Sequence, residues 1–123
     1  MMTFQPASPQ RHSILLVEDE AMIAMMLEEF VESMGYSVHA IAGTVGEACD
    51  IARNGDFDMA ILDCHLEGEE VWPVAKILDD RGIPYILSSG GSIAEMPEAF
   101  ANKPMLAKPY TIASISEFLS AQF

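Results

Sequence analysis

Four short apolar runs of this sequence each end in residues that can do chemistry. In chain order these residues are Glu18 and Asp19, then Asp63, then Ser88 and Ser89, and finally Lys108. Carboxylates that lie close together repel one another unless a cation separates them, and Mg²⁺ prefers such oxygen ligands. A carboxylate, Mg²⁺ and a lysine suit phosphoryl transfer, in which positioning and charge stabilisation do most of the catalysis. An aspartate can also act as the nucleophile and form an aspartyl phosphate.

Whether these residues meet depends on the elements that carry them. Short apolar, partly β-branched runs indicate strands that are buried on both faces. Between them, apolar residues recur at helical spacing, which indicates helices. The predicted strands are Ser13–Val17, Tyr36–Ile41, Met59–Leu62, Ile83–Leu87 and Met105–Ala107. The predicted helices are Ala21–Met34, a segment between Thr44 and Asn54, Val71–Leu78, a weak helix at Ile93–Phe100, and a last helix that Thr111 opens.

This alternation of strand and helix, repeated five times, predicts an α/β fold with a parallel sheet and helices on both faces. In such sheets the functional crevice lies beyond the carboxyl ends of the strands. The residues that follow the predicted strands therefore belong to one edge of one sheet, although they are remote in sequence.

The spacing within the helices predicts how they begin and which side faces the core. Thr44 and Glu47 have the spacing of a capping box. The methionines at helical spacing in the first helix, Met22, Met26 and Met34, are interpreted as core residues, although an exposed subset would suit a partner interface, since methionine is adaptable. Trp72 is left open between the edge of the core and an interface anchor. In the last helix the residues predicted to face inward are Ile112, Ile115, Phe118 and Leu119.

Composition limits the class of protein. The 123 residues carry 19 Asp and Glu against 6 Lys and Arg, a formal net charge of −13, and half of them are hydrophobic. This predicts one folded domain at residues 12–123 after a flexible lead-in at residues 1–11, with no effector domain. The acid excess argues against binding to nucleic acid or to an anionic membrane.

The cysteines and the amino-terminal residues give no sign of disulfide bonds, membrane insertion or secretion. Cys49 and Cys64 give no disulfide framework, and no run approaches the length of a transmembrane helix. The amino-terminal residues do not resemble a secretory signal, so we expect a cytoplasmic protein.

The residues at the strand ends resemble the receiver domain of two-component response regulators. The resemblance extends from about Ser13 to Phe123, and it rests on the combination of acidic, hydroxyl and Lys-Pro motifs after the strands. Met105 stands where many receivers have an aromatic switch residue. Further stretches look like the alphaproteobacterial "FAT GUY" subgroup, namely Asp63-x-x-Leu66-x-Gly68-Glu69, Pro73-Val74-Ala75, Arg81-Gly82-Ile83-Pro84 and Leu87-Ser88-Ser89-Gly90-Gly91.

The resemblance implies a doubly wound (βα)5 receiver fold of the flavodoxin-like type, with strand order 2-1-3-4-5. It implies that Asp63 is the phosphoacceptor and that Mg²⁺ is the cofactor. The metal ligands it implies are Asp19, Asp63 and the backbone carbonyl of His65, with Glu18 acting through water. The phosphoryl group would be bound by Ser89, with Ser88 ranked second, and by Gly90 and Lys108. The peptide bond before Pro109 would be cis.

The resemblance also implies a function. The chain would be a stand-alone phosphoacceptor that receives a phosphoryl group from a histidine kinase or a phosphotransfer protein. It would bind a downstream protein partner or act as a phosphate sink, as a monomer or weak dimer, and it would catalyse only its own phosphorylation and dephosphorylation. Two alternatives stay open: a receiver-like interaction module without phosphorylation, and an aspartyl-phosphate hydrolase, in which His65 would stand where such enzymes place a second acid.

Overall fold

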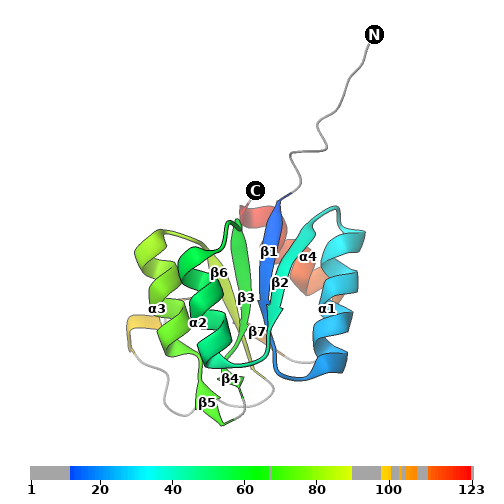
Figure 1. Cartoon of the computed structure of the whole chain (residues 1–123). Coiled ribbons are helices and arrows are strands. Elements are labelled where there is room, and N and C mark those ends of the chain that lie inside the picture. The colour runs from blue at the N-terminus through cyan, green and yellow to red at the C-terminus, as the bar shows by residue number, and fades with distance from the viewer. Residues whose placement is uncertain are drawn as a thin grey trace.

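A parallel sheet of five strands separates two layers of helices in the computed structural model of the chain (Figure 1). The structure describes residues 12–66, 68–89, 98–100, 103, 105–107 and 111–122. The predicted lead-in at residues 1–11 lies outside these residues. Within the described part, no helix is both long and apolar enough to cross a membrane.

The order of elements along the chain matches the predicted alternation. The elements are β1 (Ser13–Val17), α1 (Ala21–Ser33), β2 (Ser37–Ala42), α2 (Val45–Asn54), β3 (Met59–Asp63), β4 (His65–Leu66), β5 (Glu69–Glu70), α3 (Trp72–Arg81), β6 (Tyr85–Ser89), the 3₁₀-helix η2 (Glu98–Phe100), β7 (Met105–Ala107) and α4 (Ile112–Gln122). The predicted helix at Ile93–Phe100 lies largely outside the described residues, which show only the 3₁₀ turn of η2 at its end.

The sheet confirms the predicted topology. Its strand order is β2-β1-β3-β6-β7, and every neighbouring pair is parallel. When only the strands of this sheet are counted, the order is 2-1-3-4-5. The short strands β4 and β5 form a separate antiparallel pair that the sequence did not predict.

Each central strand contributes to two cores, one on either face of the sheet. In β1, Leu15 and Val17 pack with the layer of α2 and α3, whereas Ile14 and Leu16 pack with the layer of α1 and α4. Successive side chains of a strand point to opposite faces, so a strand that is buried on both faces needs an unbroken apolar run. An unbroken apolar run in the sequence therefore indicates a strand that is buried on both faces.

The first turns of α2 and α4 test two of the sequence predictions, and only the first of these predictions holds. The N-cap of α2 is confirmed, because the Glu47 N–H donates to Thr44 Oγ1 at 3.1 Å, and the Glu47 side chain reaches back one residue further than in a standard capping box, where Oε1 accepts from the Gly43 N–H at 2.9 Å. The inward placement of Ile112 is wrong, since its side chain is 51 % exposed. Ile112 is the first residue of α4, so no earlier turn of this helix lies beside it.

The core assignment is wrong for one of the α1 methionines, Met22, and Met25, which stands outside the apolar spacing, is exposed as well. Met22 is 84 % exposed and Met25 is 59 % exposed, whereas the buried residues of α1 are Ala24, Leu27 and Val31. A residue turns by about 100° along an α-helix, which places Met22 on the side opposite these buried residues.

Strand β6 begins two residues later than the sequence predicted. Gly82 ends α3 in the left-handed region with φ 72°, and the Ile83 N–H donates back to the Leu78 carbonyl at 2.9 Å. Ile83 therefore belongs to the helix end, and Pro84 has no N–H to give to a sheet. The strand starts at Tyr85, and it ends with Ser88 and Ser89 rather than before them.

Trp72, which the sequence left undecided, packs within the molecule. Its ring stacks on that of Phe100, with the centroids 5.3 Å apart and the planes 12° from parallel.

At the other end of α3, Asp79 binds Lys103 Nζ at 2.9 Å and accepts a hydrogen bond from Tyr85 Oη at 3.1 Å. Burial, and then the Asp79 charge, raise the pKa of the Tyr85 phenol. These contacts join α3 to the segment that precedes β7.

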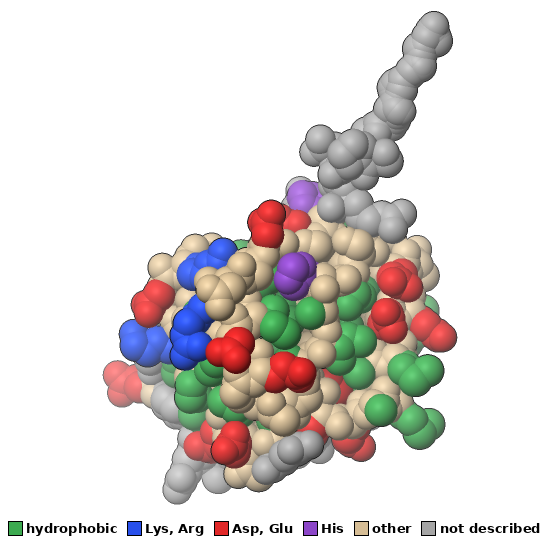
Figure 2. Space-filling view, in the orientation of Figure 1, with side chains coloured by type: hydrophobic (Ala, Val, Ile, Leu, Met, Phe, Trp, Pro, Cys, Tyr) green, Lys and Arg blue, Asp and Glu red, His purple; other side chains and the backbone are tan. Residues whose placement is uncertain are grey.

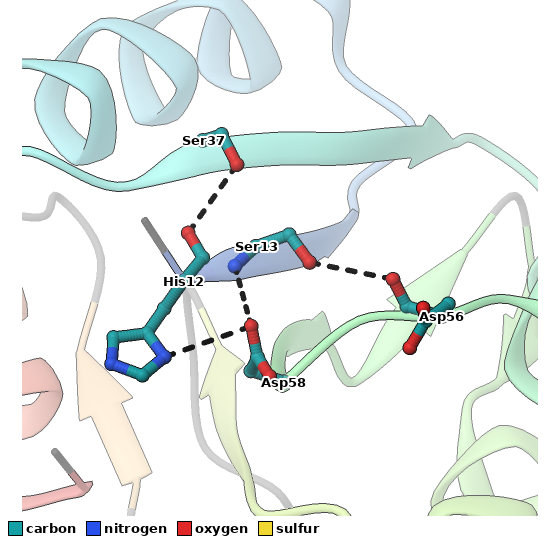
Figure 3. Close-up of polar contacts among 5 residues, drawn as sticks. All are labelled: His12, Ser13, Ser37, Asp56 and Asp58. Carbon is teal, nitrogen blue, oxygen red and sulfur yellow. Dashed lines mark hydrogen bonds and ion pairs between the residues drawn. The ribbon is translucent and has the colours of Figure 1, made fainter. Parts of the chain in front are cut away.

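Polar contacts tie β1 to its neighbours at the amino edge of the sheet (Figure 3). The Ser13 N–H donates to Asp58 Oδ2 at 2.7 Å, and the Ser13 hydroxyl donates to the Asp56 carbonyl at 3.4 Å. The Ser37 N–H and hydroxyl both donate to the His12 carbonyl, at 2.9 and 3.3 Å. Asp56 and Asp58 precede β3, so this polar cluster lies at the edge opposite the carboxyl ends of the strands.

Arg81 joins α3 to the end of α2, and its loss is expected to destabilise the fold. Its Nη1 donates to the Ala52 carbonyl at 2.7 Å and to the Gly55 carbonyl at 2.9 Å. Arg81→Met should lower the free energy of unfolding by about 1–2 kcal/mol, because two carbonyls at a helix end lose a charged donor. Urea denaturation measures this. The matched control Arg53→Met removes only an exposed ion pair with Asp50, so an equal loss in both variants would contradict the prediction.

Candidate phosphoryl-transfer site

Three carboxylates meet at the carboxyl edge of the sheet. Glu18 and Asp19 follow β1, and Asp63 is the last residue of β3. One carboxylate oxygen from each residue lies within 4.8 Å of the others. Glu18 and Asp63 are buried, with only 2 % and 6 % of their surface exposed, and Asp19 is half-buried. The structure therefore brings together the three acidic residues that the sequence singled out.

The register of the central strands explains why these residues meet. Strands β1 and β3 are parallel neighbours, with Val17 opposite Leu62. Glu18 and Asp63 are the next residues on the two strands, so they leave the sheet at the same level. Glu18 directly follows one central strand and Asp63 ends the other, and strands hold functional side chains more rigidly than loops do.

Short backbone turns orient two of the carboxylates. The Glu20 N–H donates to Glu18 Oε2 at 3.1 Å. The His65 N–H donates to Asp63 Oδ1 at 3.2 Å. In each case the donor lies two residues further along the chain, and for Asp63 this is the pattern of an Asx turn. Both side chains are thereby held at the edge of the sheet by their own backbone.

The β4–β5 hairpin adds a rim to the site. His65 opposes Glu70, and Leu66 opposes Glu69, in an antiparallel pair that follows Asp63 directly. The imidazole of His65 is exposed, whereas Leu66 is fully buried and anchors the hairpin in the core. The sequence analysis missed this hairpin. The sequence feature that could have predicted this hairpin is Gly68, because its φ of 84° lies in the left-handed region that a tight turn requires.

The serines lie on the strand next to the phosphoacceptor candidate. Ser88 is directly opposite Asp63 in the pairing of β3 with β6, and its carbonyl accepts a hydrogen bond from the Cys64 N–H at 2.9 Å. The Ser88 side chain is fully buried, with its hydroxyl 3.4 Å from the Leu62 carbonyl. Ser89, the final residue of β6, is opposite Ala107 of β7.

Three of the predicted site residues lie outside the part of the chain that the structure describes. They are Gly90, Lys108 and Pro109. Gly90 is the residue after β6 and Lys108 is the residue after β7.

The donor set at the edge fits Mg²⁺. It consists of carboxylate oxygens, which a hard divalent cation prefers to nitrogen or sulfur. Cys64 is fully buried in the core and is not a member of this carboxylate group. Within the described residues, the one group of at least three side chains placed to share a metal ion is Glu18, Asp19 and Asp63.

The sequence matches a known family model over most of its length. The model describes the response regulator receiver domain and matches residues 14–118. Among curated proteins, the phyllosphere-induced regulator PhyR of Methylorubrum extorquens is 33 % identical, over 93 % of this chain and 44 % of its own length. The chain thus spans about half the length of the curated relatives that it matches.

Solved structures agree with the fold. The solution structure of SdrG from Sphingomonas melonis Fr1 has a TM-score of 0.81 and 37 % identity, over 95 % of this chain and 98 % of SdrG. The BeF3-activated conformation of SdrG has a TM-score of 0.75 and 40 % identity, over 89 % and 93 % of the two chains. The receiver domain of the sensor histidine kinase PA1611 from Pseudomonas aeruginosa has 24 % identity and a TM-score of 0.79, over 91 % and 97 %. Its crystal structure holds a magnesium ion in the active-site cleft.

Proposed function

This chain belongs to the response regulator receiver domain family, and from this premise we propose that it accepts a phosphoryl group on Asp63. Receiver domains are typically signalling domains rather than enzymes. The single observation that carries the proposal is the cluster of Glu18, Asp19 and Asp63, with ligand atoms within 4.8 Å at the carboxyl edge of the sheet. Such an edge is where open α/β sheets bind their ligands.

Asp63 is the nucleophile in this proposal. A carboxylate oxygen of Asp63 attacks the phosphorus of a phosphohistidine, and the new O–P bond forms as the P–N bond breaks and the imidazole nitrogen leaves with the electron pair. The hydrogen bond from the His65 N–H to Asp63 Oδ1 fixes the orientation of the carboxylate for this attack. Hydrolysis of the aspartyl phosphate by water then restores Asp63.

The neighbouring acidic residues hold the cofactor. Asp19, Asp63 and the backbone carbonyl of His65 would bind Mg²⁺ directly, and Glu18 would act through a water molecule. When bound, Mg²⁺ supplies positive charge that neutralises the phosphoryl oxygens during transfer. The magnesium ion in the PA1611 receiver domain supports this assignment.

Residues after β6 and β7 complete the phosphoryl site in this proposal. Ser89 donates a hydrogen bond to the phosphoryl group, because it is the last residue of β6, whereas the hydroxyl of Ser88 is buried 3.4 Å from the Leu62 carbonyl. Gly90 and Lys108, which lie outside the described residues, would supply a backbone N–H and an ammonium group.

The proposed signal passes to other proteins. The phosphoryl donor is a histidine kinase or a phosphotransfer protein, and the phosphorylated chain, as a monomer or weak dimer, binds a downstream partner or drains phosphate as a sink. The BeF3-activated form of SdrG supports a phosphorylation-dependent change of state.

Phosphorylation by a small donor tests the proposal. With Mg²⁺ and acetyl phosphate, intact-protein mass spectrometry should show the addition of one phosphoryl group, and beryllofluoride should shift amide signals around Asp63. Asp63→Asn should show neither response. Asp56→Asn, an exposed acid at the opposite edge, is the matched control and should respond like the wild type. If the wild type showed neither response, the remaining function would be that of a receiver-like interaction module that is not phosphorylated. Multiple turnover of ordinary phosphoesters would instead indicate the hydrolase.

A further inference from the structure

Asparagine precedes glycine at one place in this sequence, Asn54-Gly55, at the carboxyl end of α2. An asparagine side chain is chemically labile, because the backbone nitrogen of the next residue can attack its amide carbon. Glycine in that next position favours the attack, since it has no Cβ to hinder the nitrogen and its backbone turns freely. The other asparagine, Asn102, is followed by lysine. Chemistry alone therefore singles out Asn54 as a candidate for deamidation.

The structure requires the glycine of this pair. A Cβ atom on Gly55 would lie 2.8 Å from the Ile51 carbonyl oxygen, 2.8 Å from His39 Nε2 and 3.0 Å from Phe57 Cδ1. The contact with a helix carbonyl cannot be relieved by turning a side chain, so packing at the end of α2 excludes a larger residue. The reactive dipeptide therefore cannot be removed at Gly55 without a shift of the backbone.

The closed end of α2 keeps the two reacting groups apart. Side chains on a helix tilt toward its amino end, and Asn54 does so, because its Nδ2 donates to the Asp50 carbonyl at 3.1 Å. The Gly55 N–H donates to the Ile51 carbonyl at 2.7 Å. The attacking nitrogen and the amide that it would attack are thus each bound to a helix carbonyl. Reaction requires the last turn of α2 to open.

Arg81 of α3 holds this turn closed from outside the helix. Its Nη1 donates to the carbonyls of Ala52 and Gly55, at 2.7 and 2.9 Å, on either side of Asn54. Its Cζ also lies 5.8 Å from the centroid of the buried Phe57 ring, a cation–π contact that fixes the guanidinium. Figure 2 shows Lys and Arg side chains gathered over α2 and α3, at the left of the view. Since the Gly55 carbonyl must move when the turn opens, Arg81 opposes the opening.

We propose that Asn54 is a deamidation site that reacts when the last turn of α2 opens, and that Arg81 controls how often it opens. In the open turn the Gly55 nitrogen, which has lost its proton to hydroxide, attacks Asn54 Cγ. The new bond from nitrogen to Cγ forms as the bond from Cγ to Nδ2 breaks, and Nδ2 leaves as ammonia after taking a proton from water. Water then opens the cyclic imide to aspartate or isoaspartate.

Either product weakens the end of α2. Aspartate at position 54 places a negative charge at the carboxyl end of a helix, where the macrodipole disfavours it, and four residues after Asp50. Isoaspartate lengthens the backbone by a carbon atom, which moves the Gly55 carbonyl relative to Arg81. Both products lose the Nδ2 donor to the Asp50 carbonyl. The modification therefore accumulates with the time that the turn spends open, and it loosens the contact between α2 and α3.

Peptide mapping by mass spectrometry measures the reaction on the full chain. The native chain and the same chain unfolded in urea are incubated at one temperature and one mildly alkaline pH. Peptides with asparagine, aspartate or isoaspartate at position 54 are then separated and quantified. The native chain should react at least about tenfold more slowly than the unfolded chain. Its rate should rise with pH, because the attacking nitrogen must lose its proton.

Hydrogen exchange of the Gly55 amide measures the same opening without any substitution. Exchange and deamidation both require the bond from this amide to the Ile51 carbonyl to break. The factor by which the fold slows exchange and the factor by which it slows deamidation should therefore agree within about threefold. A larger difference would mean that the reaction does not pass through this opening.

A variant of Arg81 tests the control of the opening. Arg81→Met should speed the native reaction about tenfold, because the loss of its contacts raises the open population. The two chains should react equally when unfolded, since Arg81 is remote from the dipeptide in sequence. The matched control Lys76→Met removes an exposed cation of the same helix, which pairs with Asp80. Its rate should stay within about twofold of the wild type.

A substitution that mimics the product tests its effect on the fold. Asn54→Asp should lower the melting temperature by about 2–4 °C, because it introduces the unfavourable charge. Asn54→Gln keeps a neutral amide and should stay within about 1 °C of the wild type. Equal melting temperatures of the two variants would contradict a loosening by the new charge.

Four results would overturn the proposal. They are no reaction of the native chain while the unfolded chain reacts, equal rates in the native and unfolded chains, equal native rates in Arg81→Met and the wild type, and a native rate that climbs with urea in parallel with global unfolding. The last result would assign the reaction to the unfolded state. The reaction uses neither Mg²⁺ nor a phosphoryl group. A failure of the beryllofluoride response would therefore count against the proposed function and not against this site.

Discussion

Asp19→Asn is expected to weaken Mg²⁺ binding at least about tenfold and to stabilise the metal-free fold. Three carboxylates with oxygens within 4.8 Å repel one another when no cation separates them. Neutralising one of them removes part of this repulsion, which should raise the free energy of unfolding by on the order of 1 kcal/mol in metal-free buffer. In the wild type, Mg²⁺ should raise the melting temperature, because a ligand that binds only the folded state stabilises it.

Thermal denaturation across a Mg²⁺ titration measures both effects. The wild type should melt at higher temperature as Mg²⁺ is added, and Asp19→Asn should start higher and rise less. Asp56→Asn is the control, since Asp56 is exposed and lies at the amino edge, away from the cluster. If Asp19→Asn and Asp56→Asn gained equal stability without metal, the effect would come from net charge and not from the cluster.

Leu62→Ala is expected to cost about 3 kcal/mol of unfolding free energy, one of the largest losses that a single side chain of this fold can cause. Leu62 is fully buried and packs in the core between the sheet and the layer of α2 and α3. It is also the residue before Asp63, on a strand with neighbours on both sides. A core that is packed at crystal density relaxes only partly around a deleted side chain.

Urea denaturation measures this loss as a lower midpoint. Ile112→Ala is the matched control, because it shortens an aliphatic side chain that is 51 % exposed; its cost should stay within about 0.5 kcal/mol. If both substitutions were equally destabilising, Ile112 would be more deeply packed than the structure shows.

The comparison of these two residues also shows which kind of burial a sequence pattern can predict and which it cannot. Leu62 lies in an unbroken apolar run, and such a run is needed only by a strand that is buried on both faces, so its burial could be predicted. Ile112 stands at helical spacing from buried residues, and periodicity alone placed it in the core. Periodicity reports the direction of a side chain around the helix, but it does not report whether another element covers that turn.

The sequence by itself determined the alternation of elements, the parallel sheet and the identity of the acidic cluster. Parallel strands that are buried on both faces are apolar throughout, and their ends meet at one edge, so local composition was sufficient to place Glu18, Asp19 and Asp63 together. Only the tertiary structure decided the extent of β6 through Ser89, the β4–β5 hairpin and the stacking of Trp72 on Phe100. It also decided that Met22 and Met25 face solvent. These features depend on which surfaces meet across the chain, and a local pattern carries no record of such contacts.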